Sequence, residues 1–307
     1  MDGVLVVDKP EGITSHDVVA VARRVLRERR IGHTGTLDPL ATGVLPLACG
    51  KATRLVRFLT AADKEYEAAI RFGITTDSYD ITGTETGRMP GRVGRDEVVA
   101  GMAALSGEYL QMPPPYSAKK VDGIRAYALA RRDEPVALKA VPVRVTGVEL
   151  LAFDGEHCRV RLTSSAGFYV RSFAHALGQS VGTGACLEGL RRTRSGDFTL
   201  AGAIGIDELQ GEADGEANGA AGWIVPIEQL LPRFPAVTVT DEGRMRVSHG
   251  RTLEASHYQP GPAVPEAAVQ GAAVQEAWVR VLDAEGRLLA LAQGAGRDCL
   301  HPEVVLI

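Results

Sequence analysis

The segment Gly32–Pro46, "GHTGTLDPLATGVLP", has neither the spacing of an amphipathic helix nor the alternation of a strand. Its glycines, threonines and prolines are turn formers, and they surround one carboxylate, Asp38, which a proline follows directly. Taken alone, an aspartate before a proline is more commonly a turn or cap residue than a reactive group. The segments on either side of this loop decide between these two interpretations.

Helices and strands alternate on both sides of the loop. Ser15 can cap a helix that we expect over residues 16–28, and no βαβ unit repeats along the chain. The pattern therefore predicts an α+β fold with a mixed, mainly antiparallel sheet. The other elements expected from periodicity and turn residues are strands at 3–9 and 64–73, glycine-ended helices at 95–107 and 169–182, and a hairpin at 143–165 that turns at Asp154–Gly155.

Length and composition restrict the class of protein. A chain of 307 residues with 45% hydrophobic content can bury a large core, and its length suggests one large domain and one smaller domain. No apolar run is long enough for a membrane helix and no signal peptide is evident, so we expect a cytoplasmic protein that does not contact a membrane. The cysteines are far apart and form no CxxC pair, which disfavours a zinc site and a disulfide framework.

Charge is distributed unevenly along the chain. Residues 1–210 carry 27 Lys and Arg against 25 Asp and Glu, whereas residues 211–307 carry 7 against 13. The basic side chains cluster in Ala22–Arg30, Lys119–Arg132 and Leu190–Arg194. These clusters are dense enough to contact a phosphate backbone, although such runs are more commonly solvated helix faces.

The last part of the chain has a different pattern. Short apolar strands beyond residue 232 predict a small β-rich domain. The stretch 211–222 is rich in small and acidic residues, and the stretch 254–277 is rich in Ala, Pro and Gln. Neither has the periodic apolar face of a packed element, so we expect loops there.

Six segments resemble the bacterial tRNA pseudouridine-55 synthases, the TruB family. They are "VLVVDKPEGITSHDVV" (4–19), "GHTGTLDPLATGVLPLACGKATRL" (32–55), "KEYEAAIRFGITTDSYDITG" (64–83), "PPPYSAKKVDGIRAYALAR" (113–131), "GFYVRSFAHALG" (167–178) and "LRRTRSG" (190–196). The resemblance implies a catalytic domain at 1–232, with a thumb at about 111–138 and the acidic loop 211–222. It continues more weakly into a PUA-like RNA-binding domain at 233–307, which contains the low-complexity loop 254–277. Phe168 departs from the family, which usually has threonine there.

The resemblance implies isomerisation of uridine to pseudouridine at position 55 in the T-loop of tRNAs. This reaction breaks the N1–C1′ bond, turns the base and rejoins it through C5, so we expect no redox cofactor and no metal. Asp38 would attack C1′ or take a proton from C2′, and both roles require an ionised carboxylate. The resemblance assigns Arg171 as its partner, and a planar two-point contact would orient the carboxylate and keep it ionised.

The target base must leave the RNA fold and be held flat. By the same resemblance, Tyr66 stacks on the uracil and relays a proton at C5, Tyr169 and Leu190 line the pocket, and His33 occupies the space that the base leaves. Without the family resemblance, the more common interpretation of Tyr66 is a half-buried strand residue. Tyr169 and Leu190 would then be core residues, and His33 a hydrogen-bonding loop residue.

The thumb carries the expected RNA contacts. The partner is the T-loop of tRNA, and we expect a monomer that needs no protein partner. One alternative is a catalytically idle RNA-binding or tRNA-folding protein, and the presence of Asp38, Tyr66 and Arg171 disfavours it. The other is an RNA-guided synthase of the archaeal and eukaryotic type, and the thumb segment disfavours it. The side chains expected to contact phosphates are Lys119, Lys120, Arg125, Arg131 and Arg132.

Overall fold

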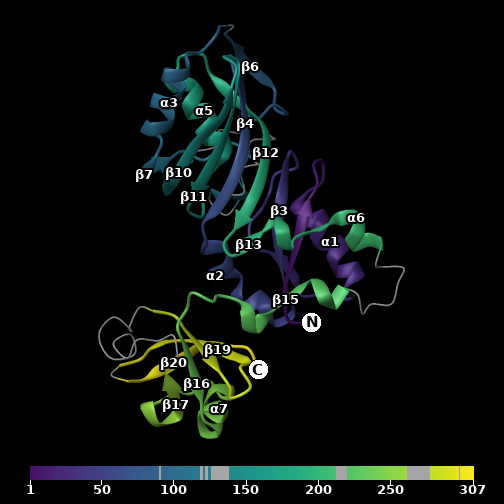
Figure 1. Cartoon of the computed structure of the whole chain (residues 1–307), viewed down its shortest axis with the longest axis vertical. Coiled ribbons are helices and arrows are strands. Elements are labelled where there is room, and N and C mark those ends of the chain that lie inside the picture. Colours follow the sequence, from purple (N-terminus) through teal and green to yellow (C-terminus); the bar gives the residue numbers. More distant parts are fainter. Residues whose placement is uncertain are drawn as a thin grey trace.

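An eleven-stranded mixed sheet runs along the long axis of the molecule, and a five-stranded sheet lies at one end (Figure 1). The structure is a computed structural model. It describes residues 1–89, 91–117, 120–121, 124–125, 138–211, 220–260, 277–296 and 298–307, with 120–121, 124–125 and 220–221 described by their backbone alone.

The main path of the large sheet has the strand order β14-β1-β3-β12-β4-β11-β10-β7. Its β1–β14 and β12–β3 pairs are parallel and its other pairs are antiparallel, which confirms the predicted α+β class with a mainly antiparallel sheet. The strands are β1 (Gly3–Lys9), β2 (Ile31–His33), β3 (Ala41–Cys49), β4 (Lys64–Phe72), β7 (Gly107–Gln111), β10 (Val141–Phe153), β11 (His157–Ser164), β12 (Ala185–Ser195), β13 (Phe198–Thr199), β14 (Ile204–Gly205) and β15 (Ile224–Pro226).

Strand β4 has one buried face. From Lys64 to Phe72 its residues alternate strictly between buried and half-buried positions, because successive side chains of a strand point to opposite faces. Helix α5 (Val170–Ser180) packs on β4 and β12, and α3 (Arg95–Ala104) packs on α5 and β10. These helices contribute Phe173, Leu177, Val98 and Met102 to the main core.

Helix α1 (Ser15–Val25) begins one residue earlier than expected, and Thr14 is its N-cap. The Thr14 hydroxyl accepts from the Asp17 amide, and the Asp17 carboxylate accepts from the Thr14 amide, which completes a capping box. The prediction that Ser15 caps this helix was therefore wrong. The Ser15 hydroxyl instead bonds the backbone of Leu37 in the loop before β3.

The other predicted elements agree with the structure in type. Residues 64–73 contain β4, and 143–165 form the β10–β11 hairpin, which turns where Gly155 has a φ of +96°. The helix expected over 95–107 ends at Ala104, because Gly107, at φ +81°, already begins β7. The remaining elements outside the C-terminal sheet are α2 (Val56–Ala61), α6 (Ile206–Gly211) and the two-stranded pairs β5 (Ile74–Thr76) with β6 (Glu85–Arg88) and β8 (Lys120–Val121) with β9 (Ile124–Arg125).

The second sheet has the order β17-β16-β18-β19-β20. Its strands are β16 (Ala236–Val239), β17 (Tyr258–Pro260), β18 (Val279–Leu282), β19 (Leu288–Gly294) and β20 (Leu300–Val305), and α7 (Asp241–Ser248) packs against β19 and β20. The sequence did not predict α7, and β17 lies in the stretch 254–277 that was expected to be a loop. Residues 212–219 and 261–276, which make up most of the two expected loops, lie outside the described residues.

The two sheets meet in an apolar cluster. Leu288 and Leu291 of β19, and Leu306 directly after β20, pack with Val4 and Val44 from β1 and β3. The large sheet ends at Pro226 and the second begins at Ala236, and the domain boundary at 232/233 stays a prediction. None of the helices in the described ranges combines the length and the apolarity that crossing a membrane requires.

Candidate active site

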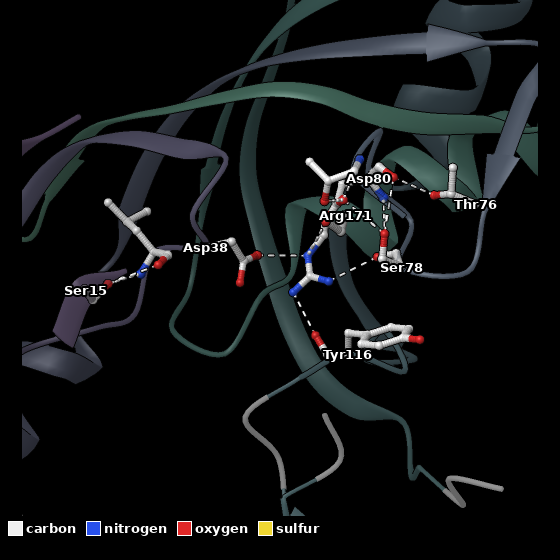
Figure 2. Close-up of polar contacts among 9 residues, drawn as sticks. Ser15, Asp38, Thr76, Ser78, Asp80, Tyr116 and Arg171 are labelled. Carbon is white, nitrogen blue, oxygen red and sulfur yellow. Dashed lines mark hydrogen bonds and ion pairs between the residues drawn. The ribbon is translucent and has the colours of Figure 1, made fainter. Parts of the chain in front are cut away.

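The loop between β2 and β3 is held in place from three sides. The Ser15 hydroxyl lies 3.0 Å from the Leu37 carbonyl and 2.9 Å from the Leu37 amide (Figure 2). The Lys9 ammonium donates to the Pro39 carbonyl at 3.3 Å, and the Arg192 guanidinium donates to the Gly35 carbonyl at 3.1 Å. Helix α1, β1 and β12 therefore fix the backbone on both sides of Asp38.

Asp38 faces Arg171 from α5. Figure 2 shows the two side chains pointing toward each other. The Arg171 Nε lies 2.9 Å from Asp38 Oδ2, and the side chain of Asp38 is 41% exposed whereas that of Arg171 is 7% exposed. The other guanidinium nitrogens donate to backbone carbonyls, Nη1 to Ser78 at 3.0 Å and Nη2 to Tyr116 at 2.9 Å. The expected pair is present, but the contact to the carboxylate is made by one nitrogen and is not the two-point contact that the sequence suggested.

A second carboxylate, Asp80, lies on the other side of Arg171 and was not among the predicted site residues. Its Oδ2 is 3.7 Å from the Arg171 Nε, and its side chain is 8% exposed. Asp80 Oδ1 accepts from the Ser78 hydroxyl at 3.0 Å and from the Thr82 amide and hydroxyl at 3.1 and 2.6 Å. The run "TTDSYDITG" (75–83) contained the signal, because its Asp, Ser and Thr residues favour a turn with side-chain to backbone bonds.

A cavity of about 250 Å³ opens beside the pair. The predicted residues Asp38, Tyr66, Tyr169, Arg171 and Leu190 all line it. The structure brings these five together from the loop, β4, the N-cap and first turn of α5, and β12. The remaining lining residues are Gly35, Thr36, Leu37, Thr60, Lys64, Ser117, Ser165, Gly167, Phe168, Val170 and Arg192.

Tyr66 stands on the buried face of β4 and is 9% exposed. In the sheet it is paired with Arg192 of β12, and the Arg192 guanidinium also hydrogen-bonds the Tyr66 hydroxyl. Arg192 is 1% exposed, and burial lowers its pKa. The phenol is thus bonded to a cation inside the protein while its side chain borders the cavity.

His33 lies in β2 and does not line the cavity. Its ring makes an edge contact with His16 at a centroid distance of 5.4 Å, and its Nδ1 is buried without a partner among the described residues. Burial lowers the pKa of His33, and the neighbouring His16 and Arg192 add to this effect, so His33 is neutral at pH 7. Its role in filling the space left by the base stays a prediction.

Phe168, the departure from the family pattern, is accommodated. It is 8% exposed, and its ring lies 6.1 Å from that of Phe173 in the core. The next residue, Tyr169, exchanges two hydrogen bonds with the side-chain amide of Gln111, at 2.8 and 3.0 Å. The backbone that carries Tyr169 is therefore fixed despite the bulky neighbour.

The predicted RNA-contacting residues lie where side chains are not described. Lys119, Arg131 and Arg132 fall outside the described residues, and Lys120 and Arg125 are described only as a backbone pair of β8 and β9. Their contacts stay predictions. Within the described ranges, no group of three or more His, Cys, Asp or Glu side chains is arranged to hold a metal ion.

Three comparisons place the chain among known proteins. The model of the TruB family pseudouridylate synthase (N terminal domain) matches residues 23–170. The tRNA pseudouridine synthase B of Solibacter usitatus is 41% identical over 100% of both chains. That of Aromatoleum aromaticum is 39% identical, over 99% of this chain and 92% of the relative.

Solved structures agree with these matches. An archaeal box H/ACA sRNP Nop10–Cbf5 complex contains a chain with a TM-score of 0.73 and 27% identity, covering 99% of this chain and 86% of that one. A chain of an H/ACA RNP bound to a substrate RNA containing 2′-deoxyuridine has a TM-score of 0.75 and 27% identity, covering 99% of this chain and 85% of that one. Because identity near 40% extends over the whole of both sequences, the chain belongs to the TruB family of pseudouridylate synthases.

Proposed function

We propose that the protein isomerises uridine to pseudouridine at position 55 in the T-loop of tRNAs. The observation that supports this most strongly is the Asp38–Arg171 contact of 2.9 Å beside a cavity that Tyr66 also lines. The relatives that match over the full chain are tRNA pseudouridine synthases B, which supports tRNA as the substrate.

Asp38 is the group that acts on the sugar. Its carboxylate either attacks C1′ or takes the proton from C2′ while the N1–C1′ bond breaks, and the geometry is compatible with both. Arg171 holds the carboxylate towards the cavity, and Asp80 offsets part of the buried positive charge of the guanidinium. The reaction is an isomerisation without a change of oxidation state, so we propose no redox cofactor.

The base is held by the walls of the cavity. Tyr66 stacks on the extruded uracil, and Tyr169 and Leu190 complete the pocket. The phenol of Tyr66 relays the proton that C5 loses when the new bond forms, and its bond to Arg192 fixes the position of the hydroxyl.

Tyr66→Phe separates stacking from proton relay. The ring is kept, so tRNA affinity should stay within a few-fold of the wild type, whereas the loss of the hydroxyl should slow single-turnover isomerisation by about a hundredfold. Tyr66→Leu should lose stacking as well and bind more weakly. Filter binding and tritium release from C5-labelled uridine measure the two effects, and a Phe variant as fast as Tyr would leave only the stacking role.

The thumb is proposed to hold the T-loop through phosphate contacts. Lys119, Lys120 and Arg125 changed together to Gln should weaken binding at low salt. Since each contact contributes roughly 0.7 to 0.9 to the slope of log affinity against log salt, the slope should fall by about 2. Catalysis at saturating tRNA should be kept. If the slope of log affinity against log salt and the affinity are both unchanged, other residues contact the phosphates, first among them Arg191 and Arg194.

The protein is proposed to act alone. The solved neighbours are chains of H/ACA ribonucleoprotein complexes, whereas the relatives with the higher identity are tRNA pseudouridine synthases B of nearly the same length as this chain. The monomeric state, the cytoplasmic location and the RNA-binding role of residues 233–307 stay predictions.

Site mapping tests the proposed position. A tRNA transcript treated with the enzyme is reacted with a carbodiimide and then with mild alkali, which leaves the adduct on pseudouridine alone. Reverse transcription then stops beside each pseudouridine. One new stop at position 55 is expected, and a transcript with cytidine at that position should give none. Stops elsewhere, or none with bound RNA, would contradict the proposal.

A further inference from the structure

The cavity beside Asp38 contains more buried positive charge than negative charge. Among the described residues, Lys64, Arg171 and Arg192 line it, and Asp38 is the one acidic residue of that lining. Lys64 and Arg192 are 5% and 1% exposed, respectively. Such burial is rare for a cation unless a carboxylate accompanies it.

Lys64 and Arg192 have neutral partners. The Lys64 ammonium donates to the Thr60 and Ala62 carbonyls at the end of α2. Arg192 donates from Nε to the Val44 carbonyl at 2.7 Å, and its other described partners are the Gly35 carbonyl and the Tyr66 hydroxyl. In the part of the chain that the structure describes, neither side chain forms an ion pair with a carboxylate.

The environment of Lys64 reflects this imbalance. The pKa of Lys64 is lowered to about 8, mainly by burial and also by the Arg192 charge, while the Asp63 charge opposes the shift. An ammonium has three N–H donors, and carbonyls occupy two of them. No acceptor among the described residues takes the third, which can therefore donate to a ligand in the cavity that Lys64 lines.

The proposed reaction produces an anion in this cavity. When the N1–C1′ bond breaks, its electron pair stays with the base, and the negative charge spreads over N1, O2 and O4 of the uracil. C1′ meanwhile bonds to the Asp38 carboxylate, or C2′ gives its proton to it. C5 then bonds to C1′. In the first route this bond displaces the Asp38 carboxylate from C1′, and in the second route Asp38 returns the proton to C2′. In both routes C5 finally loses its proton and N1 gains one.

We propose that Lys64, together with Arg192, stabilises the detached uracil as an anion while it turns from N1 to C5. This inference rests on the proposed function of the site. Preorganised cations in a water-poor cavity stabilise a charge that develops during the reaction more than they stabilise the neutral bound base. The two side chains thereby act on the departing base, whereas Asp38 and Arg171 act on the sugar.

The alternative is that Lys64 only caps the carbonyls of α2. The two roles differ in how the effect of a mutation depends on the leaving group. Fluorine at C5 withdraws electron density, so 5-fluorouracil carries negative charge more easily than uracil and needs less help from a cation. A loss of structural capping would slow both substrates equally.

The test compares tRNA transcripts that contain uridine or 5-fluorouridine. Single-turnover reactions with excess enzyme follow the disappearance of the N1-linked nucleoside at position 55 in nuclease digests. Lys64→Met should slow the uridine substrate by about a hundredfold and the fluorinated one by about tenfold or less. Lys64→Arg should recover most of the rate, because it keeps the charge.

Two further variants keep the test decisive. Lys64→Gln removes the charge but keeps N–H donors for the carbonyls, so it replaces Lys64→Met if the latter does not fold, and it should show the same dependence on the leaving group. Lys51→Met removes an exposed lysine outside the cavity and should show no such dependence. Affinity for tRNA should change by no more than a few-fold in all variants.

Equal slowing of the two substrates in the neutral variants, or no slowing at all, overturns the inference and leaves Lys64 as a cap of α2. An inactive wild-type protein is a different result, because it rejects the proposed function itself. The comparison therefore separates the two failures.

Discussion

Replacing Asp38 by asparagine is expected to abolish turnover while tRNA binding stays within a few-fold of the wild type. The amide has the size of the carboxylate and can still accept from Arg171, 2.9 Å away, but it neither attacks C1′ nor takes a proton from C2′. Loss of a group that reacts covalently costs on the order of 10⁴-fold in rate or more. Single-turnover tritium release and filter binding measure the two quantities.

Asp197→Asn is the matched control for this substitution. Asp197 is exposed, pairs with Arg233 at 3.5 Å and lies outside the cavity, so its variant should react at the wild-type rate. An Asp38→Asn protein that still releases tritium at a tenth of the wild-type rate would mean that another group acts on the sugar.

Arg171→Lys should be almost as damaging. The guanidinium donates to Asp38, Ser78 and Tyr116 from three different nitrogens in one plane, and Asp80 lies beside it. An ammonium donates from a single atom and cannot reach partners spread in this way. We expect a loss of about 10²- to 10³-fold in the single-turnover rate, with little change in affinity.

Arg161→Lys provides the comparison for Arg171→Lys. Arg161 also contacts two carboxylates, Glu67 at 2.9 Å and Glu149 at 2.8 Å, but its side chain is 40% exposed. Exposed ion pairs contribute little, so this variant should stay near the wild type. A rate for Arg171→Lys within tenfold of the wild type would show that charge alone, without the planar geometry, positions Asp38.

The fold class was predictable because local patterns agreed with the tertiary structure. The alternation in β4 and the Asp154–Gly155 turn specify a strand and a hairpin without reference to the rest of the chain. Ser15 was assigned wrongly although the sequence contained the signal, because Thr14 and Asp17 have the spacing of a capping box. The contact of Ser15 with Leu37, far along the sequence, could not be predicted locally.

The site was predictable only in part, for a similar reason. Asp38 and Arg171 were identified through family resemblance, since nothing in either segment alone brings them to 2.9 Å. Asp80 was missed because its turn motif has an ordinary structural explanation. Lys64 could have been noticed, because it shares the alternating register of the buried residues Tyr66 and Ile70 in β4.

The C-terminal region shows where composition misleads. The stretch 254–277 lacks an apolar period, yet its first part forms β17, which pairs with β16 through Val237, Thr238 and Val239. Helix α7 is short and mostly polar, so its periodicity carries little information. Both elements depend on the sheet on which they pack.

Tritium release by the wild-type protein is the measurement that decides whether the site is catalytic. A T-loop tRNA transcript labelled with tritium at uridine C5 is mixed with excess protein, and binding is measured on the same samples. Pseudouridine carries carbon at C5 where uridine carries hydrogen, so one tritium equivalent per tRNA should pass to water. Folded protein that binds the transcript and releases no tritium would contradict the enzymatic role and leave a tRNA-binding protein.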